Sequence, residues 1–169
     1  MNKLEMKVCG DLVLREKCTP VADITPELLN TMSEMVKMMK SQSGVGLAAP
    51  QVGITQRFLV MMDPDTETVY KMINPQILSK SDETVVMEEG CLSVLGSDGL
   101  PVYSNVRRPA SVVVEWTNEN GEKLSAQMSG VPARIVQHET DHLDGVLFID
   151  YLSGVKREML MRKVNRGHK

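Results

Sequence analysis

Two histidines and a glutamate in the last third of the chain have a spacing suited to binding a metal ion. The stretch from Gln137 to His142 reads Gln-His-Glu-Thr-Asp-His and contains His-Glu-x-x-His. On a helix, His138 and His142 project from one face and can bind one divalent metal ion. Glu139 follows the first histidine, so its carboxylate can reach a water molecule on the metal. The structural alternative is a histidine pair on an amphipathic helix, but we expect this pattern by chance in roughly one chain of this size per two hundred.

The motif does not by itself define the third metal ligand. A catalytic metal of this kind usually has three protein ligands and one open position. The one other histidine, His168, is the penultimate residue of a polar tail, which makes it a poor candidate. Glu158 could serve as a downstream carboxylate, and Cys91 lies in a tight Glu-Gly-Cys-Leu-Ser stretch. A lone cysteine is most often a small buried apolar residue. These residues alone therefore do not decide whether Glu158 or Cys91 is the third ligand.

Three stretches taken together resemble the peptide deformylase family. They are the glycine-rich segment 44–53, the Glu-Gly-Cys-Leu-Ser stretch 89–93 and the His-Glu-x-x-Asp-His-Leu stretch 138–143, in this order. The resemblance runs from about residue 11 to 152 and so covers nearly the whole chain. It implies that residues 1–169 form a single catalytic domain. It also implies a hydrolase of protein biosynthesis that removes the formyl group from the formyl-methionine of newly synthesised polypeptides.

The resemblance implies a role for each of these motifs. Cys91 matches the third metal ligand, beside the two histidines of the helix. Glu139 matches the general base, which takes a proton from the attacking water and returns it to the leaving amine. The Gln51 amide and the backbone N–H of Leu92 match the groups that stabilise the oxyanion. The positions that match substrate-binding residues of the family are Val45, Gly46, Met87, Gly90, Val131 and Ile135.

The family also implies a cofactor, a partner and a compartment. The cofactor is one divalent ion, Fe²⁺ in the cell, although Zn²⁺, Ni²⁺ or Co²⁺ could occupy the same site, and residue types do not choose among them. The partner is a formyl-methionyl nascent polypeptide, and we expect neither membrane nor DNA binding. The chain has no signal peptide or transmembrane run, and its three cysteines suggest no disulfide framework. We therefore expect a cytoplasmic protein, or an organellar one if a transit peptide was removed.

Two other functions are compatible with parts of the pattern. A zinc peptidase would use His138, His142 and Glu158 as ligands and would cut internal peptide bonds. A non-catalytic relative would bind formylated chains without cutting them, but it would have no use for Glu139 as a base. The resemblance also implies a pocket for the methionine side chain near Val45, Met87, Val131 and Ile135. Several relatives carry an aliphatic residue at the position of Arg134, whose stem could still pack there.

The apolar patterns predict an α+β fold, with short, mostly antiparallel strands around a central helix. That helix should begin at Ser129-Gly130, carry both histidines and end at Asp144-Gly145. An amino-terminal helix should follow the cap Thr25 and end near Ser41, and a carboxy-terminal helix should run from Ser153 to about Val164. The chain has 169 residues, enough for a real core, and its 13 methionines are expected to fill gaps in that core.

Strands are expected where short apolar runs are bounded by turn residues. The predicted strands are 57–62, 69–73 closed by Asn74-Pro75, 83–88, and a hairpin of 110–117 and 123–128. The segment 94–109 is rich in Gly, Ser and Pro, and we predict a long surface loop beside the cleft.

Charge is unevenly distributed along the chain. From Lys156 to Lys169 there are six basic residues and one acidic residue, a balance of +5, whereas the whole chain carries −3 and the preceding part therefore −8. A basic terminal helix could contact ribosomal RNA. We favour the alternative that these cations complement the dipole at the carboxyl end of the helix.

Overall fold

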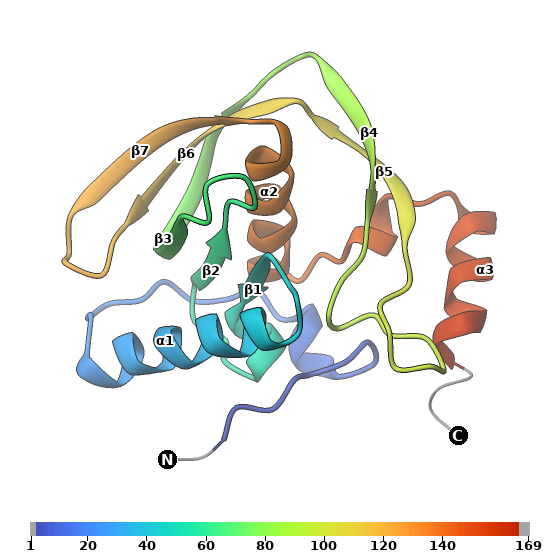
Figure 1. The fold of residues 1–169 in the computed structure, drawn as a ribbon, viewed down its shortest axis with the longest axis horizontal. Coiled ribbons are helices and arrows are strands. Elements are labelled where there is room, and N and C mark those ends of the chain that lie inside the picture. The colour runs from blue at the N-terminus through green and yellow to red at the C-terminus, as the bar shows by residue number, and fades with distance from the viewer. Residues whose placement is uncertain (1–2, 166–169) are drawn as a thin grey trace.

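In the computed structural model, which describes residues 3–165, the central helix α2 (Gly130–Leu143) lies between two antiparallel sheets (Figure 1). One side of α2 packs on the larger sheet, and the smaller sheet lies on the other side. The α+β architecture and the central histidine-bearing helix are thereby confirmed. The helix begins and ends within a residue or two of the predicted positions.

The larger sheet has five strands, and every neighbouring pair is antiparallel. On its central strands, side chains alternate between the core and the outer face, which explains why Val112, Val114 and Trp116 are all buried. These residues pack against Ile135 and Val136 of the helix. The strands, in spatial order, are β1 (Gly46–Ala48), β2 (Phe58–Met62), β3 (Val69–Lys80), β6 (Ser111–Thr117) and β7 (Lys123–Ser129).

One predicted strand boundary was wrong. The strand that begins at Val69 does not close at Asn74-Pro75 but continues to Lys80. Its pairing with β6 shifts register between Ile73 and Gln76, which marks a bulge, and proline is tolerated at a bulge. Asn74 has a positive φ of 50° there, and its amide exchanges two hydrogen bonds with the Val21 backbone, at 2.8 and 2.9 Å.

The smaller sheet consists of β4 (Thr84–Glu89) and β5 (Ser104–Pro109). The prediction of a loop over 94–109 is therefore wrong for residues 104–109, which form β5. The reason is that β5 turns Val106 and Arg108 toward the interior, and both are buried. An arginine at an inward position hides the alternation of polar and apolar residues by which a strand is recognised.

Two further helices flank these sheets. In α1 (Pro26–Ser41), Thr25 Oγ1 accepts a hydrogen bond from the Leu28 N–H at 3.2 Å, as its predicted capping role requires. Three methionines of α1 are fully buried, at positions 32, 35 and 39, which confirms methionine as a core residue. In α3 (Gly154–Asn165), Leu160 and Val164 pack into a cluster with Phe148 of η3 (Phe148–Tyr151). None of the helices described is long and apolar enough to cross a membrane.

Candidate metal centre

The fold brings together one cysteine and two histidines from separate elements. Cys91 lies directly after β4, whereas His138 and His142 lie one turn apart on α2. The three side chains are buried, and their potential ligand atoms all lie within 4.8 Å of one another. Cys91 Sγ is 3.4 Å from His142 Nε2. Three donor atoms this close can bind one ion, and a thiolate with two imidazoles is a donor set typical of zinc or iron.

Glu89 orients the first histidine. Its Oε1 accepts a hydrogen bond from His138 Nδ1 at 2.8 Å, so Nε2 is the nitrogen that can bind a metal once it has lost its proton. Burial would raise the pKa of Glu89, but hydrogen bonds from His138 and Arg108 outweigh burial and lower the pKa to about 2. Arg108 Nε and Arg134 Nη1 each lie 2.7 Å from Glu89 Oε2. The carboxylate is therefore ionised and can only accept, so His138 must carry its proton on Nδ1.

His142 has the protonation state that a metal ligand needs. Burial, together with the nearby charges of His138 and Arg108, lowers its pKa well below the ordinary value. The imidazole is therefore neutral near pH 7 and offers a lone pair. Its Nδ1 has no hydrogen-bond partner among residues 3–165, which is consistent with Nε2 being the nitrogen that faces Cys91.

Glu139 is buried beside these ligands, and one of its oxygens, Oε2, has no partner within the described residues. Burial raises the pKa of its carboxyl to about 7, and the negative charge of Glu89 adds to the increase, which His138 partly opposes. A carboxyl with such a pKa can accept and return a proton near neutral pH. The β1 backbone approaches it closely, because a Cβ built on Gly46 would lie 2.7 Å from Glu139 Cγ.

The side-chain amide of Gln51 lies beside Cys91. It is buried in η2 (Ala49–Val52), where its Oε1 accepts a hydrogen bond from the Ala48 N–H at 2.9 Å. This contact turns Nε2 toward Ser93 Oγ at 3.0 Å and toward Cys91 Sγ at 3.5 Å. An N–H donor thus lies beside the thiol. Leu92 follows Cys91, and a Cβ built on Gly44 would lie 2.9 Å from its Cδ1.

The residues predicted to bind substrate fall into three groups by the element that carries them. Ile135 and Val131 lie on the same face of α2 as the histidines, one and two turns before His138, and both pack in or against the core. Met87 and Gly90 belong to β4 and its end, and Val45 and Gly46 to the β1 side. A cavity of about 320 Å³ near the beginning of α2 is lined by Met87 and also by Gly130 and Arg134.

The structure also shows where two charged residues named in the sequence analysis, Glu158 and Arg134, lie. Glu158 lies on the exposed face of α3, where it pairs with Arg162 at 2.7 Å, so the structure does not bring it to the metal ligands. Arg134 lines the cavity near the beginning of α2. Its guanidinium donates to Glu89, to the Val106 carbonyl at 2.8 Å and to the Val85 carbonyl at 2.7 Å, and thereby joins α2 to β4 and β5.

Sequence reasoning missed the ion-pair network behind the ligands. Arg108 binds Glu89 and also Asp141 Oδ2, at 2.8 Å, and the Tyr151 hydroxyl donates to the same Asp141 oxygen. The position of Glu89, two residues before Cys91, is the one signal that pointed to it. Nothing in the sequence singles out Arg108, which lies 17 residues beyond Cys91 and contacts Glu89 because β5 pairs with β4.

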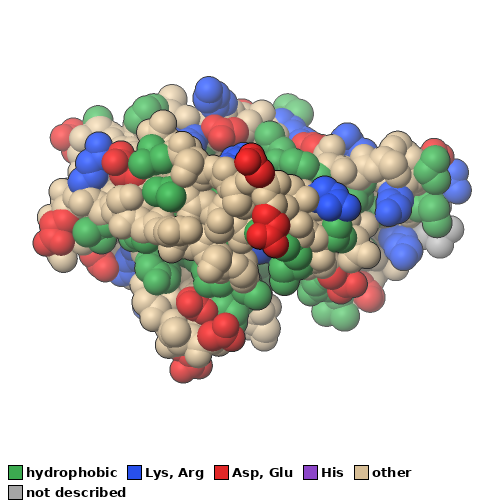
Figure 2. Space-filling view, turned by 90° about the horizontal axis from the view of Figure 1, so that it is seen from above, with side chains coloured by type: hydrophobic (Ala, Val, Ile, Leu, Met, Phe, Trp, Pro, Cys, Tyr) green, Lys and Arg blue, Asp and Glu red, His purple; other side chains and the backbone are tan. Residues whose placement is uncertain are grey.

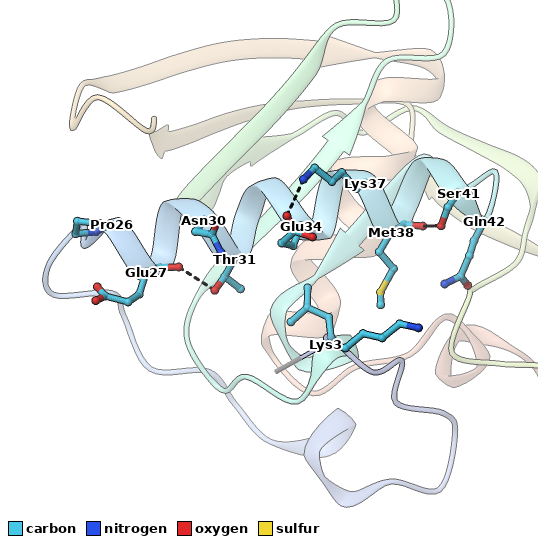
Figure 3. A pocket seen from close by; sticks show the side chains of 11 residues that line it. Lys3, Pro26, Glu27, Asn30, Thr31, Glu34, Lys37, Met38, Ser41 and Gln42 are labelled. Atoms are coloured by element: carbon cyan, nitrogen blue, oxygen red, sulfur yellow. Dashed lines mark hydrogen bonds and ion pairs between the residues drawn. The ribbon is translucent and has the colours of Figure 1, made fainter. Parts of the chain in front are cut away.

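A different and larger cavity lies along α1. It measures about 1010 Å³ and runs between that helix and the Lys3-Leu4 segment (Figure 3). Its labelled side chains come from the amino-terminal segment and from one face of α1, and they include the Lys37–Glu34 ion pair. None of the residues that line it was predicted to bind metal or substrate. The chemistry described above therefore belongs to the cluster around α2 and not to this cavity.

Comparison with known proteins gives one consistent result. The polypeptide deformylase family profile matches residues 3–158. A peptide deformylase of Endomicrobium trichonymphae is 42% identical over 170 residues, which covers 100% of this chain and 98% of the relative. A peptide deformylase of Thermotoga neapolitana is 43% identical over 159 residues, covering 94% and 93%.

Solved structures agree with the sequence relatives. The peptide deformylase of Ehrlichia chaffeensis in complex with actinonin superimposes with a TM-score of 0.92 at 33% identity, covering 100% of this chain and 99% of the other. The peptide deformylase of Thermotoga maritima superimposes with a TM-score of 0.82 at 41% identity, covering 90% and 99%. The resemblance noted in the sequence therefore extends to the fold.

Proposed function

Because the chain belongs to the polypeptide deformylase family, we propose that it removes the formyl group from the amino-terminal formyl-methionine of newly synthesised polypeptides. The observation that carries the proposal is the convergence of Cys91, His138 and His142 beside the buried carboxyl of Glu139. Formamide hydrolysis needs an activated water, a group that moves protons and donors for the oxyanion, and the residues around α2 offer all three.

We assign the metal to Cys91, His138 and His142. A divalent ion held there would lower the pKa of a water molecule and so supply hydroxide near neutral pH. The donor atoms fit Fe²⁺, and also Zn²⁺, Ni²⁺ or Co²⁺, and we propose Fe²⁺ in the cell on the resemblance to the family. Glu89 supports this assignment, because its contact with His138 fixes which nitrogen of that ligand is available.

We assign proton transfer to Glu139, and stabilisation of the oxyanion to Gln51 and Leu92. Glu139 accepts the proton of the attacking water and later returns it to the leaving amine, a task that suits a pKa of about 7. The Gln51 amide N–H and the Leu92 backbone N–H stabilise the oxyanion. Losing one such donor typically costs on the order of 3 kcal/mol of transition-state stabilisation. Gly46 and Gly90 present backbone groups to an extended substrate, and the methionine side chain extends toward Met87, Val131 and Ile135.

We further propose that residues 1–169 act as one catalytic domain in the cytoplasm, with formyl-methionyl nascent polypeptides as substrates. The family match over residues 3–158 supports the single domain. The bacterial origin of the relatives supports the compartment.

The basic helix α3 could contact the ribosome or could simply be solvated. Figure 2 shows Lys and Arg side chains gathered at the end of the molecule where α3 lies, and its described cations, at positions 156, 157, 162 and 163, are exposed. Residues 166–169, which carry further positive charge, lie outside the described residues. We continue to favour the solvated helix. Charge replacement at Lys156 and Lys163 tests this better than truncation, because Leu160 and Val164 are buried, and it should leave ribosome co-sedimentation unchanged.

The test is hydrolysis of formyl-Met-Ala-Ser by protein prepared anaerobically with iron, and separately with nickel. We expect formate and free Met-Ala-Ser, identified by mass spectrometry, and no product cut at an internal bond. Internal cleavage would instead favour a peptidase. Peptide binding without any product would favour a non-catalytic relative.

A further inference from the structure

A tyrosine lies over the backbone of Gly90. Tyr103 directly precedes β5, and the register that pairs Glu89 with Ser104 brings Gly90 opposite Tyr103 one step further along. A Cβ built on Gly90 would lie 2.6 Å from Tyr103 Cδ1 and 2.9 Å from its Cζ. The aromatic ring therefore occupies the space that a side chain at position 90 would fill.

The ring lies on the side of this segment that faces away from α2. Glu89 points toward α2, because its carboxylate contacts His138 and Arg134. Successive side chains of a strand point to opposite faces, so the side-chain position of Gly90 faces the other way. Val86, which lies on that outer face by the same alternation, is 45% exposed. Tyr103 thus belongs to the outer face of the segment.

Tyr103 does more than cover the glycine. A ring that only sealed the backbone would be buried against it, yet Tyr103 is 59% exposed and offers apolar area to solvent. The loop that carries it is held by backbone contacts, since the Val102 N–H donates to the Val94 carbonyl at 3.1 Å and Leu95 forms a bridge with Pro101. An aromatic side chain placed on an ordered segment can contact a ligand at a low cost in conformational entropy.

We propose that Tyr103 recognises the second residue of the formylated chain and favours a large apolar or aromatic side chain there. The inference rests on the proposed function, in which an extended substrate lies along Gly90 with its methionine directed toward α2. In an extended peptide the next side chain points the opposite way, which is the side on which Tyr103 lies. Contact between two aromatic rings contributes about 0.5–1.5 kcal/mol beyond the area that they bury.

Selectivity measured on a peptide series tests this inference. The substrates are formyl-Met-X-Ser with Gly, Ala, Leu or Phe at X, and the quantity is kcat/KM for Phe divided by kcat/KM for Gly. We expect Tyr103→Ala to lower this ratio about five- to tenfold, through KM rather than kcat. Tyr103→Phe should keep the ratio, because the ring and not the hydroxyl makes the contact. Leu100→Ala, which changes another exposed apolar residue of the same loop, should also keep it.

An unchanged ratio in Tyr103→Ala, or an equal loss on every peptide including Gly, would overturn the inference. Binding of the same peptides to metal-loaded Glu139→Ala and to its double variant with Tyr103→Ala measures the preference without turnover. A protein that releases no formate from any peptide would contradict the proposed function. The binding series would then still decide the role of Tyr103.

Discussion

Glu89 links a metal ligand to two buried cations. Its carboxylate accepts hydrogen bonds from His138, Arg108 and Arg134, and all of these side chains are buried. Each arginine has a second task, because Arg108 also binds Asp141 and Arg134 also holds two strand carbonyls. The orientation of the metal ligand therefore depends on the same group that neutralises the interior charges.

Replacing this carboxylate should weaken metal binding and the fold together. In Glu89→Gln, the two arginines lose their shared counter-charge, and one acceptor oxygen remains where His138 and the arginines now share two. We expect a loss of roughly 3–5 kcal/mol in the free energy of unfolding. Metal affinity should fall about 10- to 100-fold. Urea unfolding and competition with a metal chelator measure the two effects.

The neighbouring glutamate provides a matched control. Glu88 carries the same side chain on the exposed face of β4, so Glu88→Gln should change unfolding by less than about 0.5 kcal/mol. Unaltered metal affinity in Glu89→Gln would mean that His138 does not need this partner.

At the residue level, the sequence predicted the groups that carry chemistry better than the groups that support them. The spacing of His138 and His142 predicted a shared face because helix geometry alone produces one. Arg108 could not be predicted, since its contact with Glu89 arises from the pairing of β4 with β5, whose register the sequence does not reveal. Supporting residues of this kind become visible only when tertiary pairing is known.

Among the secondary-structure elements, the approach of β1 to α2 is the contact on which the site depends most. Gly46 belongs to β1, and its backbone lies directly against the Glu139 carboxyl group. A methyl group at this position would overlap Glu139 Cγ and Cδ, at 2.7 and 2.8 Å. The strand or the carboxyl group would have to shift.

We therefore expect Gly46→Ala to impair catalysis more than folding. A displacement of the reacting groups by about 1 Å can cost on the order of 100-fold in rate, and we expect a loss of this size in kcat/KM for formate release. The control is Gly154→Ala at the start of α3, where a Cβ meets nothing within 4 Å. Full activity in Gly46→Ala would show that Glu139 can move without consequence.

The elements themselves show where sequence patterns fail. Helices were predicted closely because their caps are local, as the contact of Thr25 with Leu28 illustrates. The errors concern β3 and β5, where Asn74-Pro75 forms a bulge instead of an end and Arg108 takes an inward position. Val21 stabilises Asn74 inside β3, where Asn-Pro would ordinarily end a strand, and Glu89 and Asp141 stabilise Arg108 where an apolar residue would be expected.

For the molecule as a whole, Arg15 and Asp150 join segments from opposite ends of the chain. Arg15 belongs to η1 (Leu12–Arg15), and its guanidinium donates to both oxygens of Asp150, at 2.7 and 3.2 Å. The Leu147 N–H also donates to Asp150, at 3.0 Å. Burial would raise the pKa of Asp150, but the hydrogen bonds from Arg15 and Leu147 lower it below its ordinary value.

A pKa that is lower in the folded state than in the unfolded state stabilises the protein at high pH. The contribution of Asp150 should be complete above its ordinary pKa of about 3.9 and should disappear as pH falls through the folded value. Both side chains are partly exposed, so we expect Asp150→Asn to cost only about 1 kcal/mol at pH 7. Urea unfolding of both proteins from pH 7 to pH 3 should show this difference shrinking below pH 4. A difference that grows in acid would contradict the assignment.

The central claim is that Glu139 moves the proton during formamide hydrolysis at the Cys91, His138 and His142 site. The most direct measurement is formate release from formyl-Met-Ala-Ser by the wild type and by Glu139→Ala, both loaded with the same metal and matched in metal content. We predict rapid release by the wild type and a loss of at least 100-fold in kcat for the variant, because removing a general base typically costs about 10²- to 10⁴-fold. Equal rates from the two proteins, at equal metal content, would contradict this account.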